Sequence, residues 1–244
     1  MSAQTSRREF LAAGLGWFPF FWRRGRYVSL AGARFQVTRH GRSPRRYLLI
    51  HGNEETARQV LLEHMQVNQG SAYIVTGHQR NVAIGAGALD PNRMFSREGA
   101  RKNLRRLNPK WGEAQTTRAL DELDRGREKL VRALFPPEGS RLLALHNNSE
   151  SYSVRDEAPI SDRVSLKNPE DPHAFFLCTD ARDFEKLAAS PYNVVLQQKA
   201  PPDDDGSLSR LAAAHGVRYV NLEVRLGNIE RQRQMVEYLE RVLS

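Results

Sequence analysis

Residues 46–54 have the sequence RYLLIHGNE, an apolar run that ends at an imidazole and, three residues later, a carboxylate. The apolar run is typical of a buried strand, and Gly52 is typical of a turn. The residues that follow have apolar positions spaced as on one side of a helix. This stretch therefore predicts a strand, a turn and a helix, the opening unit of an α/β fold.

The rest of the chain alternates in the same way between short apolar runs and helical stretches. Strands are predicted for residues 27–30 and 35–38, as a hairpin around Gly32, and for residues 72–76, 142–145, 175–178, 194–197 and 218–224. Further helices are predicted for residues 98–107, 114–134, 181–189, 208–215 and 229–243. Extended chain or loop is predicted for residues 81–89, a polar loop for 146–172 and an exposed loop for 201–206. This alternation predicts an α/β fold with three α/β/α layers and a mixed, largely parallel sheet.

Composition indicates a single folded domain. The chain has 244 residues, of which 40% are hydrophobic and 27% charged, and this composition argues against disorder as its main state. A chain of this length can bury one α/β core, which we expect within residues 27–244. The single cysteine, Cys178, excludes an internal disulfide and a cysteine-rich metal site.

The basic character of the chain is concentrated near its N-terminus. The formal charge is +9, but residues 1–26 hold five arginines against one glutamate, and +5 remains without them. The other basic side chains are densest in residues 97–106, where no aromatic side chains alternate with them as in single-strand binders. We interpret this segment as a solvated face, with binding of an anionic ligand or surface as the alternative, and expect no nucleic-acid partner.

The N-terminus has the features of an export signal. Arg7 and Arg8 closely precede an apolar run, residues 10–22, which is too short to span a bilayer comfortably and contains Pro19. This pattern resembles a twin-arginine signal and predicts a periplasmic or other extracytoplasmic location. Residues 1–26 are expected to act as the signal or, if uncleaved, as a membrane tether. A basic amphipathic surface helix is the alternative.

His51 and Glu54 are candidate metal ligands, because both would lie at the carboxyl end of a strand, where open α/β sheets gather their ligands. Catalytic zinc sites commonly combine two histidines and one glutamate with water in the fourth position. His146 is the best second histidine, since it also ends an apolar run and parallel strand ends lie close together. Surface or structural roles are expected for the other five histidines.

Four short motifs in a fixed order extend this interpretation. They are His51-Gly52-Asn53-Glu54, Asp90-Pro91-Asn92-Arg93-Met94-Phe95, Leu145-His146-Asn147 and Asn221-Leu222-Glu223-Val224. Together they resemble the ordered motifs of the zinc carboxypeptidase superfamily. The first motif is particularly similar to that of the succinylglutamate desuccinylase and aspartoacylase branch. The resemblance covers residues 46–226 and implies the fold predicted above.

The resemblance also implies a role for each matched residue. One zinc ion per chain would be held by His51, Glu54 and His146, a free carboxylate of the substrate would be bound by Asn92 and Arg93, and water would be activated by Glu223. Independently, a guanidinium fork matches a carboxylate. A glutamate within an apolar strand is costly to bury unless it is paired or functional. The alternatives are a surface ion pair for Arg93 and a solvated position for Glu223.

The function implied is zinc-dependent hydrolysis of an amide bond next to a free carboxylate. The substrate would be a peptide, a cell-wall peptide or an N-acyl amino acid. Arg80 is the candidate for stabilising the oxyanion, and Tyr152 and Tyr192 are the candidates for the tyrosine that larger carboxypeptidases place over the substrate. The alternative function is a catalytically inactive, carboxypeptidase-like binding module for peptides or anionic ligands.

Overall fold

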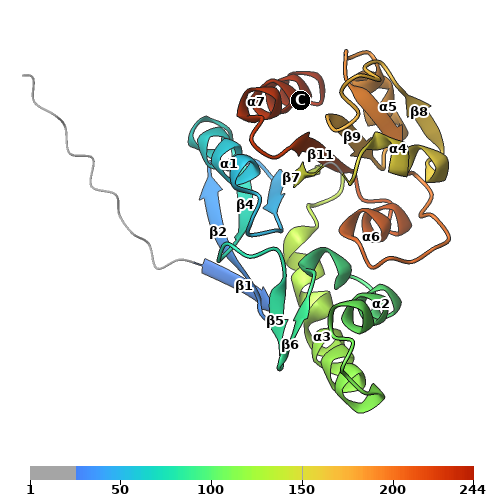
Figure 1. The fold of residues 1–244 in the computed structure, drawn as a ribbon. Helices are drawn as coiled ribbons and strands as arrows, with labels where there is room; N and C mark the ends of the chain where they lie inside the picture. Colours follow the sequence, from blue (N-terminus) through green and yellow to red (C-terminus); the bar gives the residue numbers. More distant parts are fainter. Residues whose placement is uncertain (1–25, 150) are drawn as a thin grey trace, which may run out of the picture.

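The computed structural model describes residues 26–149 and 151–244 (Figure 1). The predicted export signal, residues 1–26, lies outside this range except for Arg26, so it stays a prediction. Across the described residues, no helix combines the length and the apolar character needed to cross a bilayer.

The described residues form one nine-stranded mixed sheet. In spatial order its strands are β1 (Arg26–Leu30), β2 (Ala33–His40), β4 (Gly70–Val75), β3 (Arg46–Leu49), β7 (Leu142–Asn148), β11 (Tyr219–Arg225), β9 (Phe175–Cys178), β10 (Asn193–Leu196) and β8 (Arg163–Ser165). The central strands β4, β3, β7 and β11 are parallel, and β9 and β10 are parallel to each other but antiparallel to β11. A separate ribbon pairs β5 (Val82–Ile84) with β6 (Gly87–Leu89).

Helices cover both faces of the sheet (Figure 1). One face packs against α1 (Glu55–Val67), α5 (Ala181–Ala188) and α7 (Ile229–Val242), and the other against α2 (Arg97–Leu107), α3 (Glu113–Leu134) and α6 (Leu208–Ala214). The connecting segments contain the short helix α4 (Val154–Glu157) and the 3-10 turns η1 (Pro91–Arg93) and η2 (Ala158–Ile160). The structure thus has the three α/β/α layers predicted from the sequence.

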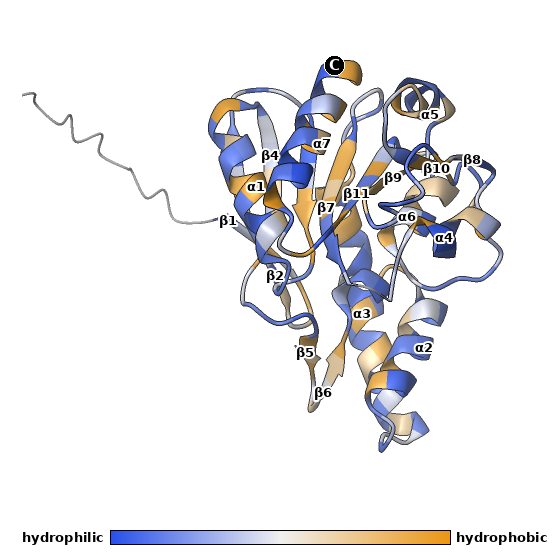
Figure 2. Ribbon diagram, turned by 45° about the horizontal axis from the view of Figure 1, so that its top comes forward, coloured by the Kyte–Doolittle hydropathy of each residue, from blue (hydrophilic) through white to orange (hydrophobic). Residues whose placement is uncertain are grey.

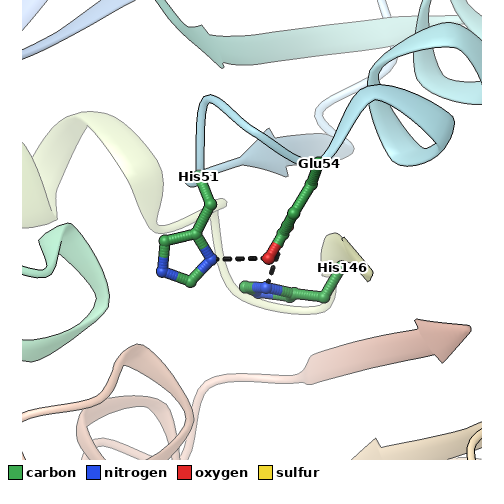
Figure 3. Close-up of side chains that lie close together, drawn as sticks. All are labelled: His51, Glu54 and His146. Atoms are coloured by element: carbon green, nitrogen blue, oxygen red, sulfur yellow. Dashed lines mark hydrogen bonds and ion pairs between the residues drawn. The ribbon is translucent and has the colours of Figure 1, made fainter. Parts of the chain in front are cut away.

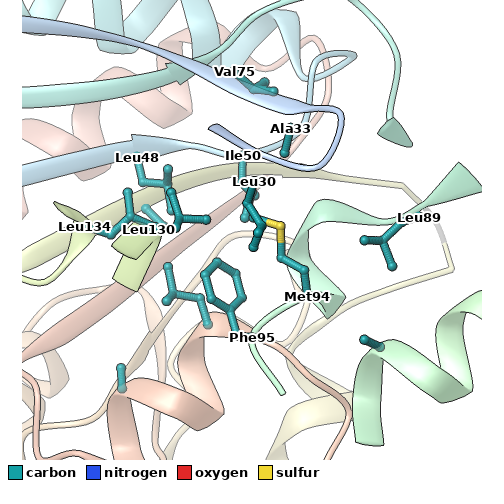
Figure 4. Close-up of a cluster of buried hydrophobic side chains, with 14 of the residues drawn as sticks. Leu30, Ala33, Leu48, Ile50, Val75, Leu89, Met94, Phe95, Leu130 and Leu134 are labelled. Carbon is teal, nitrogen blue, oxygen red and sulfur yellow. The ribbon is translucent and has the colours of Figure 1, made fainter. Parts of the chain in front are cut away.

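Alternating strand residues feed two buried cores, one on each face of the sheet. Leu48 and Ala144 belong to the core under α2, α3 and α6, whereas Leu49 and Leu143 belong to the core under α1, α5 and α7. Figure 2 shows hydrophobic residues concentrated on the central strands, and Figure 4 shows part of the first core around Phe95. The central strands bury apolar side chains on both of their faces, and this packing holds them in place. The residues at the carboxyl ends of these strands are therefore fixed as well.

The structure differs from the sequence prediction in two connecting segments. Residues 81–89 form the β5–β6 ribbon, and residues 146–172 contain α4, η2 and β8 in place of a plain loop. In addition, β7 continues to Asn148, so His146 lies inside the strand and not at its end. Polar residues continue this strand with their side-chain N–H groups satisfied, because Asn147 donates to Gln232 and Asn148 donates to the backbone carbonyl of His173.

The basic segment, residues 97–106, is laced with ion pairs. The pairs join Arg97 to Asp121 and Asp124, Arg101 and Arg105 to Glu113, and Lys102 to Asp203. Acidic neighbours therefore neutralise much of the local charge, which favours the interpretation of this segment as a solvated face.

Candidate active site

The turn after β3 brings His51 and Glu54 to the carboxyl edge of the sheet. The backbone N–H of Gly52 donates to the carbonyl of Gln79 at 3.0 Å. A Cβ at position 52 would lie only 2.6 Å from that oxygen and 2.8 Å from the carbonyl of Gly77. Glycine is therefore required here by the close approach of the neighbouring loop, and the turn that carries His51 and Glu54 is held against that loop.

Helix α1 begins directly after Glu54, yet the carboxylate of Glu54 does not cap it. The side-chain oxygen of Asn147, on β7, accepts a hydrogen bond from the N–H of Ala57 at 2.8 Å in its place. Because Asn147 satisfies this N–H of the first turn, the Glu54 side chain is not needed as its acceptor and points into the site. The same contact ties α1 to the strand that carries His146.

His51, Glu54 and His146 form one buried group with both imidazoles turned toward the carboxylate (Figure 3). The Nδ1 atom of His51 lies 2.7 Å from one oxygen of Glu54, and Nδ1 of His146 lies 3.3 Å from the other. One ligand atom from each residue lies within 4.8 Å of the other two. This group can hold a metal ion, as the sequence predicted.

The donor atoms fit zinc. Neutral imidazole nitrogen and carboxylate oxygen are common zinc ligands. The Glu54 oxygen that faces His146 is buried and accepts no hydrogen bond. A buried, unsatisfied carboxylate oxygen is costly, and a cation coordinated there would remove that cost.

The electrostatics of the group are strongly coupled. Burial disfavours the charged imidazole of His51, but Glu54 and Asp90 outweigh burial and raise the His51 pKa. Burial alone would raise the pKa of Glu54, yet the two imidazoles lower it. The carboxylate is thus kept ionised inside the protein, as a metal ligand must be.

Asp90 supports His51 from behind and was not predicted from the sequence. The Nε2 atom of His51 lies 2.8 Å from Oδ1 of Asp90, which also accepts the N–H of Asn92 at 2.9 Å. Burial opposes ionisation of Asp90, but His51 and Arg80 together lower its pKa. A metal-binding histidine generally directs its other nitrogen to such an acceptor, which fixes the nitrogen that faces the metal. The need of a metal-binding histidine for such an acceptor could have indicated Asp90 in the sequence, because Asp90 is the first residue of the second motif.

Glu223 stands beside His146, because β7 and β11 are parallel neighbours and the two residues are paired in register. Glu223 is only 5% exposed, so the alternative of a solvated position is wrong. Asn221 donates to one of its oxygens at 3.1 Å. Burial raises the pKa of Glu223 to about 7, with His146 opposing this effect and Glu54 adding to it. A carboxyl group in this range can both accept and release a proton near neutral pH.

A cavity of about 630 Å³ opens over this group. Its wall includes all the predicted site residues, namely His51, Glu54, Arg80, Asn92, Arg93, His146 and Glu223. The structure therefore brings together residues that lie up to 172 positions apart in the sequence.

Arg80 lies against the buried group of His51, Glu54 and His146. One of its terminal nitrogens is 3.5 Å from Glu54 and the other donates to Asp90 at 3.3 Å. Its side chain is 48% exposed, so it borders both the buried carboxylates and the open cavity.

Asn92 and Arg93 occupy the η1 turn on the wall of the cavity. The side-chain oxygen of Asn92 accepts the N–H of Leu208 at the start of α6, at 3.1 Å. One terminal nitrogen of Arg93 lies 3.2 Å from Asp205, so the ion pair considered as the alternative for Arg93 is present. Because this pair lies in the cavity wall, it does not exclude a role in binding.

The two candidate tyrosines lie in different parts of the structure. Tyr152 lines the cavity, where its hydroxyl donates to Glu157 at 2.7 Å and burial raises its pKa. Tyr192 packs against Phe176 and Tyr238 in the core on the other face of the sheet. Of the two, Tyr152 alone is placed to contact a molecule in the cavity.

Comparison with known proteins identifies similar folds at low identity. No family model and no curated protein match this sequence. Structures of two proteins described as candidate metallopeptidases are similar, one from Shewanella baltica (12% identity, 89% of this chain and 86% of that one, TM-score 0.43) and one from Shewanella denitrificans (12%, 90% and 82%, 0.44). N-formylglutamate amidohydrolase from Ralstonia eutropha is similar at 14% identity, over 86% of this chain and 96% of that one, with a TM-score of 0.42. At these values the reaction of this chain has to be inferred from its own residues.

Proposed function

We propose that this protein is a zinc-dependent hydrolase that cleaves an amide bond next to a free carboxylate. The observation that carries the proposal is the buried group of His51, Glu54 and His146, with Glu223 in register beside His146. Structural metal sites are usually closed by four protein ligands, whereas hydrolytic sites keep a position open and place a carboxylate nearby. Here three protein ligands face a cavity that also contains a buried glutamate.

A zinc ion bound at this group supplies Lewis-acid polarisation of a carbonyl and makes water more acidic. Glu223 takes a proton from the attacking water and delivers it to the leaving nitrogen. Its position on a rigid central strand keeps the carboxylate in place, and the hydrogen bond from Asn221 orients one of its oxygens. A positioned acid–base group of this kind contributes about 10²- to 10⁴-fold to the rate.

Recognition of the substrate carboxylate is assigned to Asn92 and Arg93, and stabilisation of the oxyanion to Arg80. Arg93 lines the cavity, and within the described residues its guanidinium donates a hydrogen bond through Nη1 alone. Arg80 lies within 3.5 Å of Glu54, so it borders the place where charge develops on the substrate oxygen.

The test of the metal site is a zinc analysis of the purified protein and its variants. Near-stoichiometric zinc, one ion per chain, is expected in the wild type and is expected to be lost in His51→Ala and His146→Ala. Glu54→Gln should also lose zinc, whereas Glu55→Gln, next to it on the exposed side of α1, should keep it. Zinc retained in His146→Ala would show that the third ligand lies elsewhere.

The test of catalysis is Glu223→Gln. This variant should retain zinc and lose about 10²- to 10⁴-fold in kcat, because the ligands are intact and the proton acceptor is gone. The substrates to screen are peptides and N-acyl amino acids, each with a free carboxylate and as the matched carboxamide. Turnover by Glu223→Gln at the wild-type rate would refute the mechanism. Absence of turnover in the wild type, with ligand binding intact, would favour the inactive binding module.

We also propose that the protein acts outside the cytoplasm, based on the twin-arginine pattern in its sequence. Fusion of residues 1–26 to a reporter that matures only after export tests this. Replacement of Arg7 and Arg8 by lysine should keep the reporter in the cytoplasm, and unaffected export would contradict the proposal.

A further inference from the structure

We infer that Asp205 is a positioning residue that holds the Arg93 guanidinium for the substrate carboxylate. The inference rests on the proposed function, since it assumes that Arg93 binds a carboxylate. It adds a residue from a loop that the sequence presents as a run of three exposed aspartates, residues 203–205.

The contacts of Arg93 are confined to one end of its guanidinium. Its Nη1 atom lies 3.2 Å from Oδ2 of Asp205 and donates to the carbonyl of Asn92 at 3.0 Å. Among residues 26–149 and 151–244, Nε and Nη2 of Arg93 donate no hydrogen bond, and the closest approach of Asp205 is to Nη1. These two nitrogens form one edge of the guanidinium fork, the arrangement that binds a carboxylate through two parallel hydrogen bonds. The contact with Asp205 therefore orients Arg93 and leaves that edge available.

Asp205 is itself held in place by contacts to its other oxygen. Oδ1 accepts the N–H of Ser207 at 2.9 Å and lies 2.9 Å from Nε of Arg210. The two carboxylate oxygens are thus divided, one for Arg210 and the backbone and the other for Arg93. With two guanidinium groups and one carboxylate, the cluster keeps a net positive charge, so an incoming anion is still attracted.

The loop that carries Asp205 is locked against the turn that carries Arg93. A Cβ at Gly99, in the first turn of α2, would collide with the backbone of Gly206. Gly206 adopts φ +75°, and its carbonyl accepts the N–H of Phe95 at 3.1 Å. Asp204 accepts a hydrogen bond from Ser96 at 2.8 Å. Since these contacts fix the loop on both sides of Asp205, its carboxylate has a fixed position in the wall of the cavity.

These contacts indicate that Asp205 positions Arg93 and does not compete with the substrate carboxylate for it. A competing carboxylate would occupy the binding edge of Arg93 and would have to leave before substrate enters. Asp205 instead contacts one nitrogen, remains anchored by Arg210 and lies on a locked loop. Removal of its charge should therefore weaken carboxylate binding, whereas removal of a competitor would strengthen it.

The test is calorimetric titration of the zinc-loaded, full-length protein with N-acetyl-L-alanine, N-acetyl-L-glutamate and L-alanyl-L-alanine, each beside its C-terminal carboxamide, with every variant and its reference in a Glu223→Gln background so that the ligands are not hydrolysed. Asp205→Asn is expected to weaken binding of the acids about tenfold, the effect of losing one charge-assisted contact, and to leave the carboxamides unchanged. Asp203→Asn is the matched control, because Asp203 belongs to the same aspartate run but pairs with Lys102 on the surface. It should bind like the wild type.

A second pair of variants shows whether Asp205 acts through Arg93. Asp205→Asn should have no further effect on acid binding once Arg93→Gln is present, and an independent effect would overturn the inference. Unchanged or tighter acid binding in Asp205→Asn alone would also overturn it. A wild-type protein that binds acids and carboxamides equally would refute the carboxylate site of the proposed function, and the inference with it. The two failures are therefore distinguishable.

Discussion

Asp90 makes the sharpest prediction for the metal site. Its Oδ1 atom receives both Nε2 of His51 and the N–H of Asn92, and its Oδ2 atom receives Arg80. Asp90→Asn keeps an oxygen of the same shape at the Oδ1 position, so the turn and the acceptor for His51 are preserved. It removes the negative charge that makes the imidazole a stronger ligand. Asp90→Ala removes the acceptor as well.

The expected magnitudes follow from this difference. Loss of the partner behind a metal-binding histidine generally costs about 10- to 100-fold in metal affinity. Asp90→Asn should lie near tenfold, because one of the two contributions survives, and Asp90→Ala near 100-fold. These factors correspond to about 1.4 and 2.7 kcal/mol.

The assay is competition for zinc between the protein and a chromophoric chelator at fixed pH. Asp203→Asn provides a control in which an exposed aspartate loses its charge. Thermal unfolding of each variant without zinc separates weaker metal binding from loss of the fold. Zinc affinity of Asp90→Ala within twofold of the wild type would refute the role assigned to Asp90.

Three further predictions concern stability and the cavity wall. Zinc at 100 times its Kd should raise the Tm of chelator-treated protein by about 5–10 °C, because binding to the native state adds about 2.7 kcal/mol to the free energy of unfolding. Absence of a shift in differential scanning calorimetry would argue against a metal site in the native protein. Burial opposes ionisation of Glu240, but contacts with His64 and Arg141 lower its pKa to about 2. A lowered pKa stabilises the fold at pH values above the unfolded pKa of about 4.5, and this stabilisation is lost as the pH falls toward 2. In urea titrations over this range, the free energy of unfolding of the wild type should fall by about 3 kcal/mol more than that of Glu240→Gln. Equal decreases in the two proteins would contradict the assignment. Gly99→Ala should push the aspartate loop away from the cavity and weaken acid binding as Asp205→Asn does; wild-type binding would show that the Gly99–Gly206 contact does not position the loop.

The candidate metal ligands were predictable because each combines residue type with strand position. His51 and Glu54 follow an apolar run that clearly predicts a strand, and a second apolar run of this kind precedes His146. The end of β7 was predicted too early, since Asn147 and Asn148 have the polar character of a loop. Their side-chain nitrogens donate to residues far away in sequence, Asn147 to Gln232 and Asn148 to His173, which local pattern cannot indicate.

Residues that act through a second residue were not predicted, and only Asp90, which opens the second motif, had a signal in the sequence. Asp90 and Asp205 belong to ordinary turn sequences, and their roles depend on His51 and Arg93, which reach them only in the folded chain. The run of three aspartates predicts a solvated turn, and Asp203 behaves that way. Asp205 differs because a close glycine–glycine contact places it in the cavity wall, and such contacts have no signature in local sequence.

The carboxamide of Asn147 has a consequence for how metal could enter and leave. It accepts from the first turn of α1 and donates to Gln232 on α7, so one side chain ties Glu54's helix and His146's strand to a third segment. The ligands are therefore assembled by hydrogen bonds that need no cation, and little ordering entropy has to be lost when an ion arrives. Metal exchange would then proceed through the open cavity without unfolding of α1. The amide proton of Ala57 would report this as hydrogen exchange that is already slow in the zinc-free protein.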